Sequence, residues 1–195
     1  MIIAVDLDDV LADSLTSFIE FYNKYYDKEL RYEDFTAYTL NEIKRIPREE
    51  ENKILEHFDK SEYFDNIKPM RDAVEVIEEL SKKHEIIIIT SRTKDKEQKT
   101  INWVNKFLKG IKKVYFIRKN YHEKPKTKSE ICKEINANIL IEDNLSYAKN
   151  CAENGIKVLL VDYPWNQEKN LHPLIRRVKS WKEILRIIKN MDKKK

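Results

Sequence analysis

The chain has 195 residues, with 38 Lys and Arg against 34 Asp and Glu and a formal net charge of +4, enough for one core domain and a small second lobe. No apolar stretch approaches the roughly 20 residues of a membrane-spanning helix, and charges of both signs are too mixed to indicate nucleic-acid binding. The two cysteines lack metal-ligand spacing and an acidic motif begins at residue 6, so we expect a cytoplasmic protein with both cysteines in its core.

The first predicted element is a buried parallel strand over residues 2–5, because all four residues are apolar. Asp6 and Asp8 follow it directly. Ligands of open α/β sheets bind at the carboxyl ends of the strands. An Asp-x-Asp pair there can hold a divalent cation and still supply a nucleophile and an acid/base group. The alternative is structural, a solvated turn in which Asp9 or Asp13 caps the next helix.

Residues 14–67 are too many for an ordinary strand-to-helix connection, and their pattern is helical and aromatic. Four aromatic residues recur at a spacing more typical of a core than of a binding site: Phe18, Phe21, Tyr22 and Tyr25. Phe35 and Tyr38, in the irregular stretch 32–39, are better candidates for substrate contact. Ser14, just past the acidic motif, is expected to face the same pocket.

Later strands also lead into polar motifs. The strand predicted over 86–89 ends in Thr90-Ser91-Arg92, where hydroxyls and a guanidinium suit phosphate, although such residues also cap helices. A strand over 114–117 leads into a basic loop, and Lys128 begins the helix that follows.

The strand predicted over 138–141 ends in Glu142-Asp143, and two adjacent carboxylates at such a place indicate metal binding. A fifth strand is predicted over 158–161. Helical patterns separate the strands, over 73–83, 95–108, 129–135 and 145–154.

This alternation predicts an α/β fold, a doubly wound, Rossmann-like parallel sheet with right-handed crossovers. Gly110 and Gly155 each fall between a helix and a strand, the left-handed position that ends a helix. Neither belongs to a nucleotide-binding glycine motif. If the first, second and fourth strands are neighbours, five residues converge at one edge of the sheet: Asp6, Asp8, Thr90, Lys128 and Asp143.

With these motifs the chain resembles the haloacid dehalogenase (HAD) superfamily of phosphohydrolases, and within it the pyrimidine 5′(3′)-deoxyribonucleotidases and their microbial relatives. The run from Asp6 to Asp13 is similar to the first family motif, Asp-x-Asp-x-(Val/Thr), with the Val-Leu-Ala-Asp continuation of that branch. The other three motifs are matched by Thr90-Ser91, Lys128 and Glu142-Asp143-Asn144. Lys126 is a rival to Lys128 as the third motif.

The resemblance implies a role for each residue. Asp6 would attack phosphorus and form an aspartyl-phosphate, while Asp8 would protonate the leaving group and later activate water. The cofactor would be Mg²⁺, held by the Asp6 carboxylate, the Asp8 backbone carbonyl and the Asp143 carboxylate, with Glu142 supporting them. Lys128 would hold phosphate and screen the charge of Asp6.

Substrate binding would fall to the second motif and the residue after it, Thr90, Ser91 and Arg92. The resemblance also implies a HAD-like core formed by residues 1–14 and 68–195, with a small helical cap over 15–67. Aromatic residues in such a cap suit base stacking, which is worth about 1–3 kcal/mol per base.

The predicted function is Mg²⁺-dependent hydrolysis of nucleoside monophosphates. Because a poor alkoxide leaving group needs a proton, the second aspartate favours a phosphatase over a dehalogenase. The alternatives are a phosphatase for a sugar phosphate, for another small metabolite or for a nucleic-acid end, which the basic loop 118–128 would suit, and a non-catalytic phosphate-binding module. The expected partner is a small phosphorylated molecule, with no membrane and no stable nucleic-acid binding. Formation of a homodimer is left open.

Overall fold

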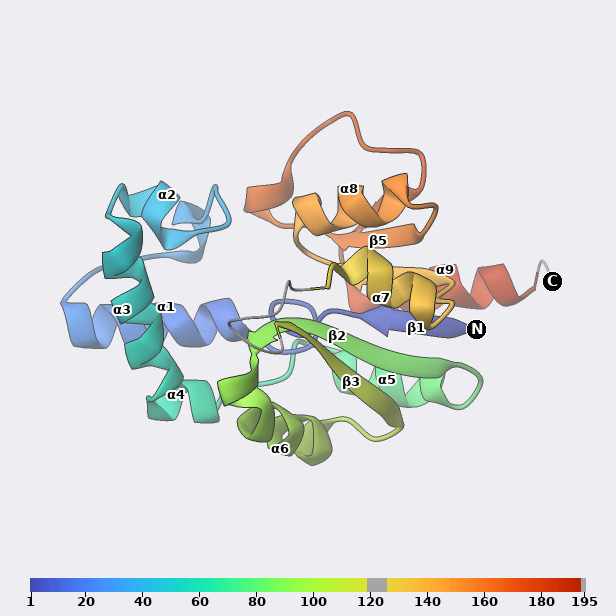
Figure 1. Cartoon of the computed structure of the whole chain (residues 1–195), viewed down its shortest axis with the longest axis horizontal. Helices are drawn as coiled ribbons and strands as arrows, with labels where there is room; N and C mark the ends of the chain where they lie inside the picture. The colour runs from blue at the N-terminus through green and yellow to red at the C-terminus, as the bar shows by residue number, and fades with distance from the viewer. Residues whose placement is uncertain (119–125, 194–195) are drawn as a thin grey trace.

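The computed structural model describes residues 1–118 and 126–193, so most of the basic loop of the nucleic-acid alternative lies outside the described residues. Its centre is a six-stranded parallel sheet with the strand order β3-β2-β1-β4-β5-β6 (Figure 1). The strands are β1 (Ile2–Val5), β2 (Glu85–Thr93), β3 (Ile111–Arg118), β4 (Ile139–Glu142), β5 (Lys157–Val161) and β6 (Ile175–Val178). The predicted doubly wound α/β fold is confirmed.

Both faces of the sheet are covered, because apolar side chains alternate between two cores. Ile3 and Val5 join one core and Ala4, between them, joins the other. The first core also holds the apolar faces of α5 (Ala73–Ser81), α6 (Glu97–Phe107) and α9 (Trp181–Asp192). The second holds those of α7 (Lys128–Glu134) and α8 (Leu145–Glu153), on the opposite side of the sheet in Figure 1.

Local details of the predictions hold at several points. Gly110 and Gly155 have φ angles of 87° and 83°, the left-handed conformation expected where a helix ends. Cys132 and Cys151 are free and buried. None of the helices within residues 1–118 and 126–193 is long and apolar enough to cross a membrane.

Two elements at the end of the chain follow no pattern that the sequence predicted. The strand β6 reads Ile-Arg-Arg-Val, and it pairs only with β5 at the edge of the sheet, so Arg176 and Arg177 need not be buried. The helix α9 begins at Ser180, whose hydroxyl accepts a hydrogen bond from the backbone N–H of Glu183. Its apolar face packs on the first core.

Between β1 and β2 the chain forms a helical insert of α1 (Ser14–Tyr26), α2 (Leu40–Lys44), α3 (Arg48–Asp59) and α4 (Glu62–Asp65), which lies to one side of the sheet in Figure 1. Aromatic rings hold it together: Phe18 and Phe58 meet edge to face at 5.4 Å between ring centroids. Phe18, Phe21 and Tyr22 are buried as predicted. Tyr25 is 47% exposed, so its core assignment was wrong.

Candidate active site

The acidic strand ends meet because β1 lies between β2 and β4. Val5 is aligned with Ile88 of β2 and with Ile141 of β4, and the backbone N–H of Asp6 donates to the carbonyl of Ile141 at 2.9 Å. The residue after β1 therefore stands beside the end of β4. The predicted neighbourhood of the first, second and fourth strands is confirmed.

Lys128 is the buried cation of this edge. Its Nζ lies 2.7 Å from Asp6 Oδ1 and 2.7 Å from Glu142 Oε2. Thr127 caps α7 and forms a reciprocal capping box with Glu130, which fixes where the helix begins and hence where Lys128 points. Burial lowers the pKa of Lys128, but the charges of Asp6 and Glu142 outweigh it and raise the pKa above its ordinary value.

The rival lysine lies outside this cluster. Lys126 is exposed, and its Nζ pairs with Glu134 Oε1 at 2.6 Å on the surface of α7. Of the two candidates for the third motif, the fold thus brings only Lys128 to the acidic edge.

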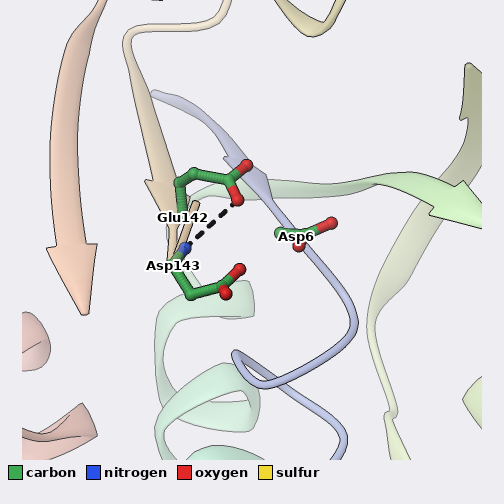
Figure 2. A group of neighbouring side chains, drawn as sticks. All are labelled: Asp6, Glu142 and Asp143. Carbon is green, nitrogen blue, oxygen red and sulfur yellow. Dashed lines mark hydrogen bonds between the residues drawn. The ribbon is translucent and has the colours of Figure 1, made fainter. Parts of the chain in front are cut away.

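The carboxylates of Asp6, Glu142 and Asp143 form a buried acidic cluster, each offering an oxygen within 4.8 Å of the others (Figure 2). Glu142 is fully engaged: Oε2 accepts from Lys128, and Oε1 accepts from the backbone N–H groups of Asp143 and Asn144. By contrast, Asp143 Oδ1 is buried and accepts no hydrogen bond from any described residue, and Asp6 Oδ1 has only its ion pair with Lys128. A buried carboxylate oxygen without a donor, close to a second carboxylate, is suited to a cation.

The electrostatics also favour a cation there. Three carboxylates face one buried lysine, which leaves an excess of negative charge. Burial and the neighbouring Glu142 raise the pKa of Asp6 to about 7, against the opposing effect of Lys128. Burial, followed by Glu142 and Asp6, raises the pKa of Asp143 well above its ordinary value. Hard oxygen donors of this kind fit Mg²⁺, and a divalent ion would balance the excess charge.

Asp8 points elsewhere, toward Arg92. The Arg92 guanidinium donates to both carboxylate oxygens of Asp8, from Nη2 at 2.6 Å and from Nε at 3.0 Å, and Ser14 Oγ donates to the same carboxylate. Burial raises the pKa of Asp8, but Arg92 and Ser14 outweigh it and hold the pKa below its usual value. The carboxylate of Asp8 is therefore occupied, and only its backbone remains to contact a metal.

The second motif lies at the same edge. Thr90 is fully buried, and its hydroxyl accepts a hydrogen bond from the backbone N–H of Arg92 at 3.1 Å. Ser91 is half-buried beside it. The register of β2 against β3 shifts between Thr90 and Thr93, an irregularity that re-aims side chains at the rim of a sheet.

Asp9 caps the next helix, as the structural alternative for the acidic motif predicted. Its Oδ1 accepts from the backbone N–H of Leu15 at 2.8 Å and so caps the start of α1, whereas Asp13 makes no side-chain cap. Its φ of 58° turns the chain back between β1 and α1. Capping by Asp9 and a functional role for Asp6 and Asp8 are thus compatible.

A short turn after β5, the 3₁₀ helix η3 (Pro164–Asn166), holds the acidic loops in place, a role that no sequence pattern predicted. Trp165 Nε1 donates to Asp143 Oδ2 at 3.1 Å, and Asn166 Nδ2 donates to the backbone carbonyl of Asp143 at 2.7 Å. The Tyr163 hydroxyl donates to the carbonyl of Asp9 at 2.7 Å, and its ring stacks on Trp165 at 4.2 Å.

A cavity of about 330 Å³ separates the helical insert from the sheet edge. Asp8, Ser14 and Arg92 line the end near the sheet, so the expectation for Ser14 is confirmed. Phe35 and Tyr38 line it from the insert, and their contact with a substrate stays a prediction. Phe18, predicted as core, lines the cavity as well as packing inward. The cavity thus combines charged groups with aromatic rings, which matches an amphipathic molecule.

Comparison with known proteins agrees with this geometry. The family model described as "5′ nucleotidase, deoxy (Pyrimidine), cytosolic type C protein" matches residues 1–194. A nucleotidase of Clostridium acetobutylicum is 29% identical over 193 residues, covering 98% of this chain and 95% of that protein. A 5′(3′)-deoxyribonucleotidase of Bacillus subtilis is 27% identical over 190 residues, covering 95% and 96%.

Solved structures show the same fold. A haloacid dehalogenase-like hydrolase of Streptococcus pneumoniae superposes with a TM-score of 0.69 at 16% identity, covering 96% of this chain and 97% of that one. A haloacid dehalogenase-like protein of Agrobacterium tumefaciens superposes with a TM-score of 0.68 at 12% identity, covering 98% of each. With a HAD-like fold and a family match over nearly its whole length, the chain belongs to the deoxy (pyrimidine) 5′-nucleotidase, cytosolic type C family, and is a phosphoric monoester hydrolase.

Proposed function

We propose that the protein hydrolyses nucleoside monophosphates in an Mg²⁺-dependent reaction through an aspartyl-phosphate on Asp6. The observation that carries this proposal is the unpartnered, buried Oδ1 of Asp143 close to the carboxylate of Asp6, which pairs with Lys128 two residues before the cavity-lining Asp8. Such an arrangement offers a nucleophile, a cation site and a second carboxylate at one place. The nucleotidase family of the chain supports the choice of substrate.

In the first half of the reaction, a carboxylate oxygen of Asp6 attacks phosphorus and the bond from phosphorus to the ester oxygen breaks. Asp8, two residues further on, takes up a proton from water when the substrate phosphate draws Arg92 away from it, and gives this proton to the departing alkoxide. In the second half, Asp8 takes a proton from a water molecule that attacks the phosphorus of the aspartyl-phosphate. The products are inorganic phosphate and regenerated Asp6.

The Asp6 carboxylate, the Asp8 backbone carbonyl and the Asp143 carboxylate would hold Mg²⁺. When bound, the ion supplies positive charge that lets a carboxylate approach a phosphate dianion. Lys128 supplies a second, resident positive charge 2.7 Å from Asp6. Glu142 keeps that lysine in place and is itself held by two backbone N–H groups.

Thr90, Ser91 and Arg92 would bind the phosphate oxygens. Arg92 faces a competition, because its guanidinium is bonded to Asp8 in the structure. A phosphate dianion beside Asp8 attracts the same guanidinium. The guanidinium can turn some of its N–H donors to the phosphate, and Asp8 then loses them. Substrate binding would therefore loosen the pair and release Asp8 for proton transfer.

Residues 15–67 would act as the cap and residues 1–14 and 68–195 as the catalytic core. The aromatic side chains that the cap contributes to the cavity, among them Phe35, Tyr38 and Phe58, suit a nucleobase. We further propose a cytoplasmic enzyme that takes a small phosphorylated substrate and binds neither membranes nor long nucleic acids stably. A homodimer is compatible with this proposal.

A substrate panel tests the proposal. Deoxynucleoside 5′- and 3′-monophosphates, several sugar phosphates and 5′-phosphorylated oligonucleotides are compared by kcat/KM from phosphate release. We expect mononucleotides to be preferred. Turnover confined to sugar phosphates would replace the nucleotidase by a metabolite phosphatase. Turnover of oligonucleotides that falls steeply with salt would indicate a nucleic-acid end as the substrate.

Chelation tests the metal. Excess EDTA should abolish phosphate release from the preferred substrate, and Mg²⁺ added beyond the chelator should restore it. Full activity in excess chelator contradicts the cation site at Asp6 and Asp143.

A further inference from the structure

The wall of the substrate cavity contains an acidic side chain for which the proposed chemistry has no use. Glu51 is only 6% exposed and lines the cavity from α3. Leu55 and Phe58, four and seven residues further along, lie on the same face of the helix and line the same cavity. A carboxylate thus interrupts an otherwise apolar and aromatic stripe.

The hydrogen bonds of Glu51 account for only part of its capacity. Its Oε1 accepts from the backbone N–H of Asn41 at 3.1 Å. Among the residues that the structure describes, no donor reaches Oε2 and no Lys or Arg forms an ion pair with this carboxylate. A carboxylate can accept about four hydrogen bonds, and burying it with few of them costs free energy.

A neighbouring carboxylate shows the contrast. Asp59, at the end of α3, also lines the cavity, but its Oδ2 lies 2.7 Å from Lys96 Nζ in an ion pair between insert and core. Asp59 therefore has a partner that explains it. Glu51 does not.

Part of the role of Glu51 is structural. The first backbone N–H groups of a helix need acceptors, and Thr39, which precedes α2, makes no side-chain cap. Glu51 supplies this acceptor through Asn41. One neutral oxygen, such as the amide oxygen of glutamine, would satisfy this need equally well. The second carboxylate oxygen and the negative charge are left without a structural purpose.

We propose that Glu51 accepts a hydrogen bond from a ring N–H of the substrate base and so selects which bases are hydrolysed. This inference rests on the proposed function, which places the phosphate at the end of the cavity that Asp8 and Arg92 line. The base then lies toward the insert, where Glu51 stands among aromatic side chains. A buried acceptor that gains its missing donor contributes selectivity that stacking alone does not.

The chemistry of the bases makes the selection specific. Thymine and uracil carry a ring N–H at N3, and guanine carries one at N1. Cytosine and adenine present a lone pair at the equivalent ring position, which a carboxylate repels. Thymine, uracil and guanine nucleotides are therefore favoured over cytosine and adenine nucleotides.

The test compares wild type with Glu51→Gln on thymidine 5′-monophosphate, deoxycytidine 5′-monophosphate and 2-deoxyribose 5-phosphate. The glutamine keeps an acceptor for Asn41, loses the charge, and can donate to a ring lone pair. We expect the kcat/KM ratio of the thymine to the cytosine nucleotide to fall by about tenfold to a hundredfold. Hydrolysis of the base-free sugar phosphate should change by less than about twofold.

Glu50→Gln is the matched control, because it changes an exposed glutamate in the same turn of α3. A second probe leaves the protein untouched: methylation of N3 in thymidine 5′-monophosphate removes the donor, and wild type should lose selectivity for it as Glu51→Gln does. Circular dichroism and the unfolding temperature verify that each variant is folded.

Nucleotide turnover with an unchanged thymine-to-cytosine ratio in Glu51→Gln overturns this inference and leaves the proposed function standing. Turnover of 2-deoxyribose 5-phosphate alone, with every nucleotide inert, overturns the proposed function and the inference together.

Discussion

The two ends of the cavity are built in different ways. At the sheet end, Asp8 and Arg92 line the cavity, and behind them Asp6, Lys128 and Glu142 come from strand ends and a capped helix and are almost fully buried. At the insert end, α3 and the loop before α2 contribute aromatic rings and Glu51, while Tyr38 is 47% exposed.

The difference separates two tasks. Charged groups that are buried and ion-paired keep a fixed geometry, which a reaction at phosphorus needs. A wall made by short helices and a loop can change its side chains without disturbing the sheet, as selection among substrates needs. Changes at the sheet end should therefore affect turnover, and changes at the insert end should affect selectivity.

The largest effect is expected for Asp6→Asn. The side chain is nearly isosteric, but a neutral amide cannot attack phosphorus, so kcat should fall by about 10³-fold or more. Because the pKa of Asp6 is raised to about 7, the folded protein prefers a neutral group there, and the unfolding temperature should not fall. Phosphate release and calorimetry measure the two quantities. An unchanged rate refutes Asp6 as the nucleophile.

Lys128→Met should also be severe. It leaves Asp6 and Glu142 without their buried cation, and breaking such a pair costs about 3–5 kcal/mol of stability. Activity should fall by about 10²-fold or more. Lys126→Met is the control, because that lysine pairs with Glu134 on the surface, and its activity should stay within about twofold of wild type. The reverse outcome would assign the third motif to Lys126.

Trp165→Phe should weaken the binding of Mg²⁺ by about tenfold, because it removes the N–H that orients Asp143 and keeps a ring to stack on Tyr163. Isothermal titration with Mg²⁺ measures the affinity directly. Trp103→Phe serves as the control, since its indole N–H donates to the backbone carbonyl of Ile67 instead. Equal affinities for Mg²⁺ in Trp165→Phe and Trp103→Phe would show that Trp165 does not support the cation site.

The smallest effect lies at the far end of the sheet, where His84 pairs with Asp192 at 3.1 Å. Burial lowers the pKa of His84 below its ordinary 6.5, and the charge of Asp192 only partly opposes this. The unfolded chain then binds the proton more readily, so this contribution to stability is complete above the ordinary pKa and is lost as the pH falls below it.

We expect the free energy of unfolding to drop less in His84→Asn than in wild type between about pH 7.5 and about pH 5. Urea denaturation at both pH values measures it, with His172→Asn as the control. Activity per folded molecule should not change, because His84 touches neither end of the cavity. Parallel pH profiles of stability in wild type and His84→Asn would contradict this account of His84.

Much of the sheet end could be predicted from the sequence, because long apolar runs locate the strands and parallel topology brings their carboxyl ends together. Asp6, Lys128 and Asp143 followed from that logic. The ion pair between Arg92 and Asp8 could not be predicted in this way, since the sequence does not show that a side chain of β2 reaches the residue after β1. Trp165 was missed for a similar reason: its bond to Asp143 depends on a turn that Arg177 of the unpredicted β6 supports through Asn166.

The insert end was less predictable. Helical spacing predicted the burial of Phe21 and Tyr22 but not the exposure of Tyr25. On a short helical lobe each helix has one inner face, and spacing alone does not fix how wide that face is. Glu51 belongs to a run of acidic residues, and such a run predicts a solvent-exposed first turn of a helix. The packing of α3 against the other helices of the insert places it inward.

Arg92 joins three parts of the molecule at a single side chain. Its guanidinium bonds to Asp8 after β1 and to Thr100 of α6, and it lies 4.8 Å from the centre of the Phe64 ring on α4. A displacement of α4 relative to the sheet would change the surroundings of that guanidinium and, through it, the partners of Asp8. In the proposed reaction, Arg92 would therefore couple the entry of a ligand beneath the insert to the release of Asp8 for proton transfer.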